Sequence, residues 1–273
     1  WESRLTSKAL EKMKVPYSMV IEEQEYKDYA SVIDKKKLII LDKSYKEKYD
    51  TCDNFGLTKS PGSGPARNFI WDYSISLGFS HHWIMDDNIH HFLRSNKNLK
   101  PKVSDGTIFR CMEDFTLRYS NVAMSGPQYE GFLPNYTNNP PFITNSRCYS
   151  CNFIRNDVPF RWRGRYNEDT ILSLDMLKKG WNTILFYAFL HKKAGTMIMK
   201  GGNTDEIYKN GTYDKSKMLV DLHPDVAKLS FKFNRVHHHV DYSKFNHLKL
   251  IKRKDLEIKK GVDNYGMVLK RVT

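Results

Sequence analysis

The sequence has few cysteines and no long apolar run. Its four cysteines are too scattered over 273 residues for the disulfide framework of a small secreted protein, so we expect a reducing cytoplasm. No stretch approaches the roughly 20 apolar residues of a membrane-spanning helix, and no signal peptide is recognisable. We therefore expect no membrane partner. The chain starts at Trp1 rather than Met, and upstream residues are expected to be missing.

Acidic residues are also in short supply. There are 31 Asp and Glu against 44 Lys and Arg, which leaves a net charge of +13. Such an excess attracts polyanions, so nucleic acid, a nucleotide or an acidic surface are natural partners. A lysine-rich composition can equally reflect an AT-rich genome, and charge alone does not decide between these explanations. Residues 249–273 are predicted to form a basic extension that lies on a phosphate backbone or is simply solvated.

The apolar pattern predicts an α/β fold. Two apolar runs, 15–22 and 37–42, are typical of strands and flank a helical pattern at 26–33, which in one sheet implies a right-handed parallel crossover. Further helices are predicted over 65–77, 109–119 and 168–179, and further strands over 79–85, 147–156 and 181–190. We expect a single domain over residues 1–248, with a mixed, mostly parallel central sheet, flanking helices and long loops.

A pair of glycines opens the helix at 65–77. Gly62 and Gly64 could let the backbone cradle a phosphate at the helix N-terminus, and Arg67 in the following turn would reinforce that site. Two glycines before a helix are also common in ordinary turns. Pro65 suits the first turn and Gly78 the end of this helix. Arg67 is therefore a candidate anion contact.

Polar residues follow the strand at 79–85. Asp86, Asp87 and Asn88 come where the end of a parallel strand opens into a ligand crevice. Two carboxylates and a carboxamide at that position indicate a metal or sugar site.

A second acidic pair lies at the start of the helix at 168–179. Asn167 is its predicted N-cap, and the helix dipole favours the ionised forms of Glu168 and Asp169 in its first turn. Acidic residues often occur at helix starts without any further role. The approach to this helix is rich in arginine and aromatic side chains: Arg161, Trp162, Arg163 and Arg165. Capping requires no arginines, so this composition favours a functional site.

Cysteine and histidine supply two candidate metal sites. Cys148 and Cys151 have no second pair at zinc-knuckle spacing, and we interpret them as ordinary buried thiols. In the run His237 to His239, an extended backbone would put His237 and His239 on one face, where they could supply a metal ligand. Solvated or DNA-facing histidines are the alternative.

The loop at 125–141 combines aromatic and amide side chains. Such side chains stack on and hydrogen-bond to sugars and flipped bases. Many large surface loops have the same composition, so this feature by itself decides nothing.

In this order, the segments between Val15 and Phe245 resemble the nucleotide-sugar glycosyltransferases of the GT-A fold. Within that fold, three runs are similar to the glycosyltransferases associated with TET/JBP-type base hydroxylases in phages. These runs are Pro-Ala-Arg-Asn-Phe-Ile-Trp, His-Trp-Ile-Met-Asp-Asp-Asn-Ile and Asn-Arg-Val-His-His-His-Val-Asp-Tyr. The resemblance implies transfer of a glucose-like sugar from a UDP-sugar to 5-hydroxymethylcytosine or 5-hydroxymethyluracil in DNA.

The resemblance also implies roles for the candidate residues. It places Asp169 as the catalytic base beside Glu168, and Asp87 as the main ligand of Mn²⁺ or Mg²⁺. Asn88 departs from the commonest acidic motif of the fold, which moves Asp86 to the ribose. The remaining implied contacts are Glu22, Arg67, Asp86 and Asn88 with the donor, His237 and His239 with the metal, and Arg161, Trp162, Arg163 and Arg165 with the DNA acceptor.

The chemistry of such a reaction fits these residue types. Charge that develops on the leaving diphosphate would be stabilised by a divalent cation and Arg67. A carboxylate on the far side of the sugar C1 would accept the proton of the attacking hydroxyl, which leads to inversion. A base in duplex DNA would have to be flipped out first.

Three other functions are compatible with the sequence. The acceptor could be a protein or a polysaccharide, or the chain could be a non-catalytic nucleic-acid-binding module. A sugar nucleotidyltransferase would usually have a longer glycine-rich phosphate loop near the first strand, which we do not find. A retaining reaction is a further alternative.

Overall fold

A computed structural model describes residues 2–194, 212–232, 234–255 and 261. Its centre is a six-stranded sheet in the order β3-β7-β5-β8-β4, with β6 also paired to β8. The glycine-rich segment 201–203 and the distal lysines Lys259 and Lys260 lie outside the described residues. The strands of the sheet are β3 (His81–Met85), β4 (Ile89–Arg94), β5 (Val122–Tyr129), β6 (Phe142–Thr144), β7 (Cys151–Arg155) and β8 (Asn182–Lys193).

Strand direction brings several chain segments to one edge of this sheet. β5 and β8 are parallel, and β3 points the same way because both β3 and β5 are antiparallel to β7. β4 and β6 run opposite to β8. The carboxyl ends of β3, β5 and β8 therefore meet the start of β4 and β7 at the same edge. The predicted mixed α/β class is confirmed.

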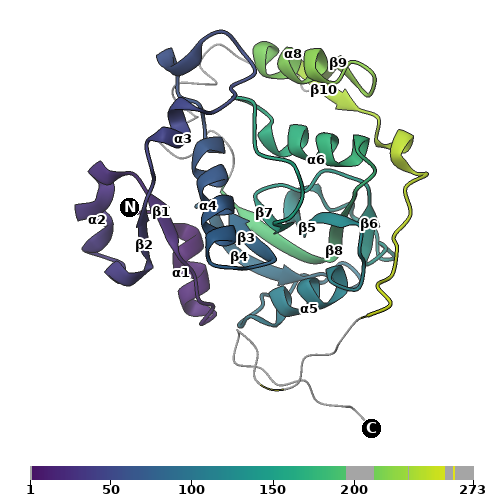
Figure 1. Cartoon of the computed structure of the whole chain (residues 1–273). Helices are drawn as coiled ribbons and strands as arrows, with labels where there is room; N and C mark the ends of the chain where they lie inside the picture. The colour runs from purple at the N-terminus through teal and green to yellow at the C-terminus, as the bar shows by residue number, and fades with distance from the viewer. Residues whose placement is uncertain (1, 195–211, 233, 256–260, 262–273) are drawn as a thin grey trace.

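Helices cover both faces of the sheet (Figure 1). On one face, α1 (Leu5–Lys12) and α5 (Thr107–Thr116) bury Leu10, Phe109 and Met112 against the strands. On the other, α4 (Gly64–Ser76) and α6 (Glu168–Lys178) bury Trp71 and Leu172. Neighbouring strand residues such as Ile184 and Leu185 belong to opposite clusters, as expected for a strand that is buried on both faces.

The bounds of α4 follow the local sequence signals. Pro65 occupies the first turn, where its missing N–H leaves no helical hydrogen bond unmade. Gly78 follows the helix with a φ of 78°, a left-handed conformation that glycine adopts without strain. The predicted helix and its end are confirmed.

The N-terminal β-α-β unit forms a small sheet of its own. β1 (Met19–Ile21) and β2 (Leu38–Ile40) are parallel, as predicted, but within the described residues they pair only with each other. Short helices connect and follow them: η1 (Glu23–Glu25), α2 (Tyr26–Ala30), η2 (Lys35–Lys37), α3 (Ser44–Glu47) and η3 (Gly56–Thr58). Contacts between α3 and α4 join this unit to the rest of the fold (Figure 1).

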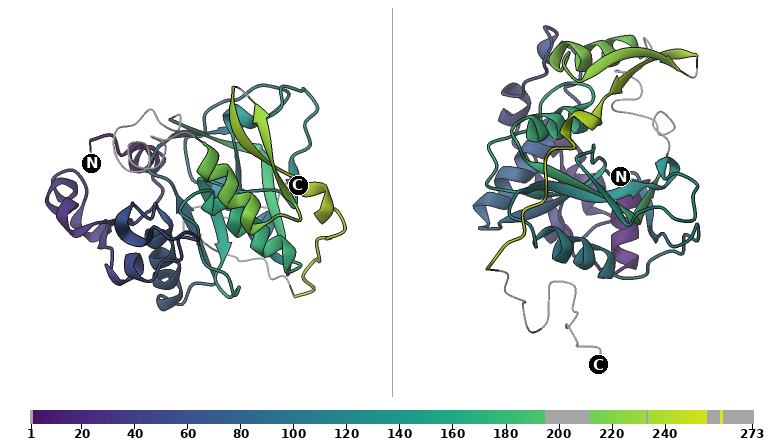
Figure 2. Two further views of the ribbon diagram at one scale, coloured as in Figure 1. Left: turned by 90° about the horizontal axis from the view of Figure 1, so that it is seen from above. Right: turned by 90° about the vertical axis from the view of Figure 1, so that its right-hand side faces the viewer.

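A C-terminal subregion packs on α6. It consists of α8 (Tyr213–Leu222), the antiparallel hairpin β9 (Ala227–Lys232) and β10 (Arg235–Val240), and η5 (Tyr242–Phe245). Leu174 and Leu177 of α6 contact Leu219 and Phe245 in one buried cluster. Figure 2 shows the hairpin rising on the side of the molecule that also carries α6.

The chain after η5 returns along the molecule toward α5 (Figure 1). The backbone N–H of Ser120 donates to the Ile251 carbonyl at 2.9 Å, and that of Arg253 donates to the Arg118 carbonyl at 2.8 Å. The described start of the basic extension is thus hydrogen-bonded to the domain. In the part of the chain with described coordinates, no helix combines the length and apolar character of a transmembrane span.

Candidate active site

Acidic and basic side chains from distant segments converge at the carboxyl edge of the sheet. Asp86 follows β3, Lys193 ends β8, and Glu168 and Asp169 form the first turn of α6. The Asp86 backbone N–H donates to the Ser150 carbonyl at 2.8 Å, which joins the end of β3 to the approach to β7. The sequence predicted the two acidic pairs separately, and the structure brings Asp86, Glu168 and Asp169 to one place.

Arg67 holds these three carboxylates together. Its Nη2 donates to Asp86 Oδ1 at 2.6 Å, and its Nη1 donates to Asp169 Oδ1 at 2.9 Å and to Glu168 Oε1 at 3.2 Å. The Arg67 side chain is only 7% exposed. Because its charge is satisfied by three half-buried carboxylates, Arg67 orders the acidic cluster in this conformation.

Burial gives Asp169 an unusual protonation equilibrium. Desolvation raises the pKa of Asp169 to about 7, and the nearby charges of Glu168 and Asp86 add to the rise while Arg67 opposes it. For Asp86, burial acts in the same direction, but the charges of Arg67 and Lys193 outweigh it and hold the pKa below its ordinary value. The pKa values of two neighbouring carboxylates thus shift in opposite directions, a pattern typical of acid–base sites.

Lys193 is a second cation of the cluster that the sequence analysis did not identify. Its Nζ donates to Ser150 Oγ at 2.7 Å, lies 3.7 Å from Asp86 Oδ2 and stands 5.2 Å from the centre of the Tyr149 ring. The side chain is 11% exposed. A signal for it was present, because Lys193 ends a strand that is parallel to β5 and so reaches the same edge.

The other residues of the first acidic motif lie at the rim of this cluster. The surrounding protein and then the charge of Asp86 raise the pKa of Asp87, although the Asp87 side chain still contacts solvent. Asn88 Oδ1 is buried and has no hydrogen-bond partner among the described residues. Glu22, predicted to bind the donor, instead pairs with Lys46 at 2.6 Å beside the small sheet. Asn88 thus has an unsatisfied acceptor to offer a ligand.

The predicted metal ligands are not brought together. Among the residues that the structure describes, no three His, Cys, Asp or Glu side chains are grouped closely enough to hold a metal ion. β10 is extended, as the face argument required, but His237 Nε2 accepts a hydrogen bond from Arg235 at 3.0 Å and His239 is exposed on the hairpin. The residues present therefore do not fit the ligand set Asp87, His237 and His239, and no step is derived through a metal.

Trp162 forms a wall behind Arg67. Its side chain is 1% exposed, and the Arg67 guanidinium stands 4.6 Å from its ring centre, an arrangement that favours the cation. Asn68 fixes this position, because its side chain donates to the Trp162 carbonyl at 2.9 Å and accepts from the Trp162 N–H at 2.8 Å. Trp162 is buried here, so a direct contact with DNA would require it to leave this site.

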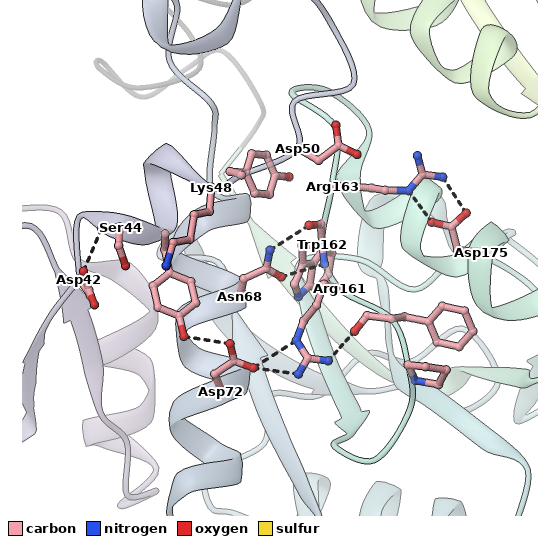
Figure 3. A pocket seen from close by; sticks show the side chains of 14 residues that line it. Asp42, Ser44, Lys48, Asp50, Asn68, Asp72, Arg161, Trp162, Arg163 and Asp175 are labelled. Atoms are coloured by element: carbon pink, nitrogen blue, oxygen red, sulfur yellow. Dashed lines mark hydrogen bonds and ion pairs between the residues drawn. The ribbon is translucent and has the colours of Figure 1, made fainter.

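The three arginines of the same segment are each paired with a carboxylate. Arg161 donates to Asp72 at 2.8 Å, and Arg163 makes a two-pronged contact with Asp175 at 2.9 Å. Figure 3 shows both pairs at the margin of a cavity of about 710 Å³ between α3, α4 and residues 159–163. Asp86, Glu168 and Asp169 do not line this cavity. This cavity is therefore not the site of the acidic cluster.

Arg165 has a structural role in this conformation. It is 1% exposed, and its guanidinium donates to Asp53 at 2.7 and 3.0 Å and to the carbonyls of Gly56 and Lys59 at 2.7 Å each. These contacts hold the loop at 53–60 against the start of α6. In this conformation Arg165 has no donor left for an acceptor.

Asn167 is at the predicted N-cap position of α6, but its side chain does not cap the helix. It adopts a left-handed conformation with a φ of 56°. Its Nδ2 donates to the Lys215 carbonyl at 2.6 Å and so ties α6 to α8. The Asn167 side chain is thus used in a tertiary contact and not in a cap. Cys148 and Cys151 are buried free thiols, as predicted.

The mixed sheet with an acidic cluster at the head of a helix is compatible with a glycosyltransferase site, and the comparison with known families gives the class. The model of the TET-associated glycosyltransferase family matches residues 1–202. The chain therefore belongs to the TET-associated glycosyltransferases and is a glycosyltransferase. No curated protein and no solved structure matches it.

Proposed function

We propose that this glycosyltransferase moves a glucose-like sugar from a UDP-sugar to the hydroxymethyl group of a 5-hydroxymethylpyrimidine in DNA, with inversion. The observation that carries the proposal is the Asp169 carboxylate, which is half-buried at the carboxyl edge of the sheet between Arg67 and Asn152. The family supplies the glycosyltransferase activity and the association with TET enzymes. The donor, the acceptor and the stereochemistry are our inference.

Asp169 is suited to the role of general base. A primary hydroxyl is a poor nucleophile at neutral pH, so its proton must be accepted as the bond to the sugar forms. A base works best with a pKa near the working pH, and burial has raised the pKa of Asp169 to about 7. Arg67 and the Asn152 amide, which donates at 3.4 Å, orient the carboxylate. Glu168 shares Arg67 and would keep that guanidinium in place.

Lys193 is the cation that we expect to stabilise negative charge on the leaving diphosphate. Lys193 is close to the end of β3 and pairs only loosely with Asp86, at 3.7 Å. The Lys193 ammonium can therefore turn toward a diphosphate more readily than the Arg67 guanidinium, which is fully engaged. A requirement for Mn²⁺ or Mg²⁺ stays a prediction, which removal of divalent cations would test.

A DNA acceptor is supported by the charge of +13 and by the family's association with base hydroxylases. The Arg161 to Arg165 segment supports it less than its sequence suggested, because its guanidinium groups already have partners. DNA contact by Arg161 and Arg163, whose pairs are at the surface, stays a prediction.

The test is mass spectrometry of nucleosides after reaction. The protein is incubated with a panel of UDP-sugars, Mn²⁺ or Mg²⁺, and duplexes that contain 5-hydroxymethylcytosine, 5-hydroxymethyluracil or unmodified pyrimidines. We expect a hexose-sized mass gain on a hydroxymethylated base and none with Asp169→Asn. Donor hydrolysis without any change in DNA would refute the DNA acceptor and favour a protein or polysaccharide. Binding of DNA without any donor turnover would refute the enzymatic role.

A further inference from the structure

A second cavity of about 230 Å³ is lined in part by Thr170, which follows Asp169 of the acidic cluster. Its lining comes from the end of β5, the loop after it, the approach to β7, the start of α6 and strand β10. The lining side chains that matter here are Phe132, Arg147, Tyr149, Thr170, His238 and Tyr242. The cavity therefore lies where the central sheet meets the C-terminal hairpin.

Two short connections place this cavity next to Asp169. Thr170, which lines it, directly follows Asp169 in the first turn of α6. On the opposite wall, the Tyr149 ring contacts the Lys193 ammonium at 5.2 Å, and Lys193 reaches Asp86 at 3.7 Å. A group bound in the cavity would thus contact the residue that directly follows the proposed base in α6.

The size of the cavity selects a small ring. Pockets for nucleotide-sized ligands usually have volumes of about 300–1,000 Å³, so about 230 Å³ is too small for a nucleotide-sugar. It is large enough for one pyrimidine ring with a one-carbon substituent. The donor must then bind elsewhere along the sheet edge.

The lining has the chemistry that recognises a nucleobase. The Tyr149 ring lies 5.9 Å from the Phe132 ring at an interplanar angle of 33°, and the Arg147 guanidinium stands 4.5 Å from the Tyr149 ring centre. Aromatic and guanidinium planes of this kind stack on extruded bases. Tyr149 Oη and His238 Nδ1 are buried and have no hydrogen-bond partner in the described part of the chain. Unsatisfied polar atoms in a cavity favour a ligand with its own donors and acceptors.

We propose that this cavity between Tyr149 and His238 is the subsite for the extruded pyrimidine of the DNA acceptor, and that β10 supplies part of its specificity. The assignment rests on the proposed DNA acceptor. The base stacks on Tyr149, its polar edge pairs with His238, and its C5 substituent points toward Asp169. Arg147 and Lys193 supply the positive charge that the adjoining phosphates require.

Photocrosslinking locates the base directly. A duplex with 5-iodouracil at the target position is irradiated with the full-length protein, and the adduct is mapped by tryptic peptides. We expect the adduct on the peptide 148–155, which carries Tyr149, or on the chain around His238. An adduct confined to residues 161–165, at the margin of the larger cavity, would overturn the assignment.

Variants give an independent measurement. Tyr149→Ala removes the stacking platform, and we expect the KM for hydroxymethylated DNA to rise by about 5- to 150-fold. Tyr149→Phe keeps the ring and should recover most of that loss. Tyr136→Ala, an aromatic residue of the neighbouring loop with 66% of its surface exposed, is the matched control and should have the wild-type KM. Because Tyr149 is partly buried, thermal melting checks the fold, and His238→Ala on the hairpin repeats the test from the other wall.

The two proposals fail in different ways. If the wild-type protein modifies DNA but the adduct lies elsewhere and all KM values stay the same, only the base subsite is wrong. If no DNA is modified and no adduct forms, the DNA acceptor is wrong and the subsite with it.

Discussion

Replacing Asp169 with Asn should stabilise the protein at neutral pH while it abolishes sugar transfer. Burial raises the pKa of this carboxyl from the ordinary 3.8 to about 7, so its ionised form is less favourable in the folded chain than in the unfolded chain. Below pH 4 both states are protonated and the shift has no effect. Between about pH 4 and pH 7, the carboxyl group ionises in the unfolded chain but not yet in the folded chain, so the protein loses stability as the pH rises. The loss levels off above pH 7.

The magnitude follows from the shift. One pKa unit corresponds to about 1.4 kcal/mol, so a shift of about three units corresponds to about 4 kcal/mol at pH 8. The side chain is 15% exposed, so solvent screening is modest. Because Asp169 shares Arg67 with Glu168 and Asp86, we expect a loss of unfolding free energy of about 2–4 kcal/mol. Asp169→Asn also leaves Arg67 and Lys193 facing two carboxylates instead of three, so the cluster becomes neutral.

Urea denaturation at pH 4 to 8 measures this effect. The free energy of unfolding of Asp169→Asn relative to wild type should grow from near zero at pH 4 to about 2–4 kcal/mol at pH 8. Asp221→Asn, an exposed carboxylate on α8, is the control and should change stability by less than about 1 kcal/mol at every pH. In the wild type, kcat/KM should rise with pH, reach half its maximum near pH 7 and level off above that pH. A stability difference that is independent of pH, or full transfer activity in Asp169→Asn, would refute the assignment of Asp169 as a buried base.

Three further predictions concern the other charges. Arg67→Gln leaves three carboxylates without their buried partner and should lower the free energy of unfolding by about 3–5 kcal/mol in urea denaturation; an effect below about 1 kcal/mol would contradict its ordering role. Arg165→Met should cost about 3 kcal/mol and expose the loop at 53–60 to proteolysis, whereas Arg161→Met, whose pair with Asp72 is 40% exposed, should change stability by at most about 1 kcal/mol; equal effects would count against the structural role. The KM for hydroxymethylated DNA should rise steeply between 50 and 200 mM salt, as expected for release of several counterions, and a salt-independent KM would argue for an uncharged acceptor.

The local sequence was sufficient for the elements that carry the site. The apolar runs at 79–85 and 181–190 predicted β3 and β8, and Pro65 and Gly78 predicted the ends of α4. These features could be read because a strand or helix is selected by the period of its apolar residues and by backbone preferences within a few positions. The acidic residues at the ends of β3 and at the start of α6 were identified for the same reason.

The partners of the charged residues were decided only by the tertiary structure. Arg165 pairs with Asp53 over 112 positions of sequence, and Arg67 joins Glu168 and Asp169 over 101 and 102 positions. The sequence indicated that these arginines were functional, but a guanidinium pairs with whichever carboxylate the fold brings within about 3 Å. The raised pKa of Asp169 has the same origin, because desolvation and neighbouring charge depend on distances in space rather than along the chain. The sequence by itself therefore determined which residues end the strands and begin the helices. The packed fold determined which of their charged side chains are paired and which remain available for a reaction.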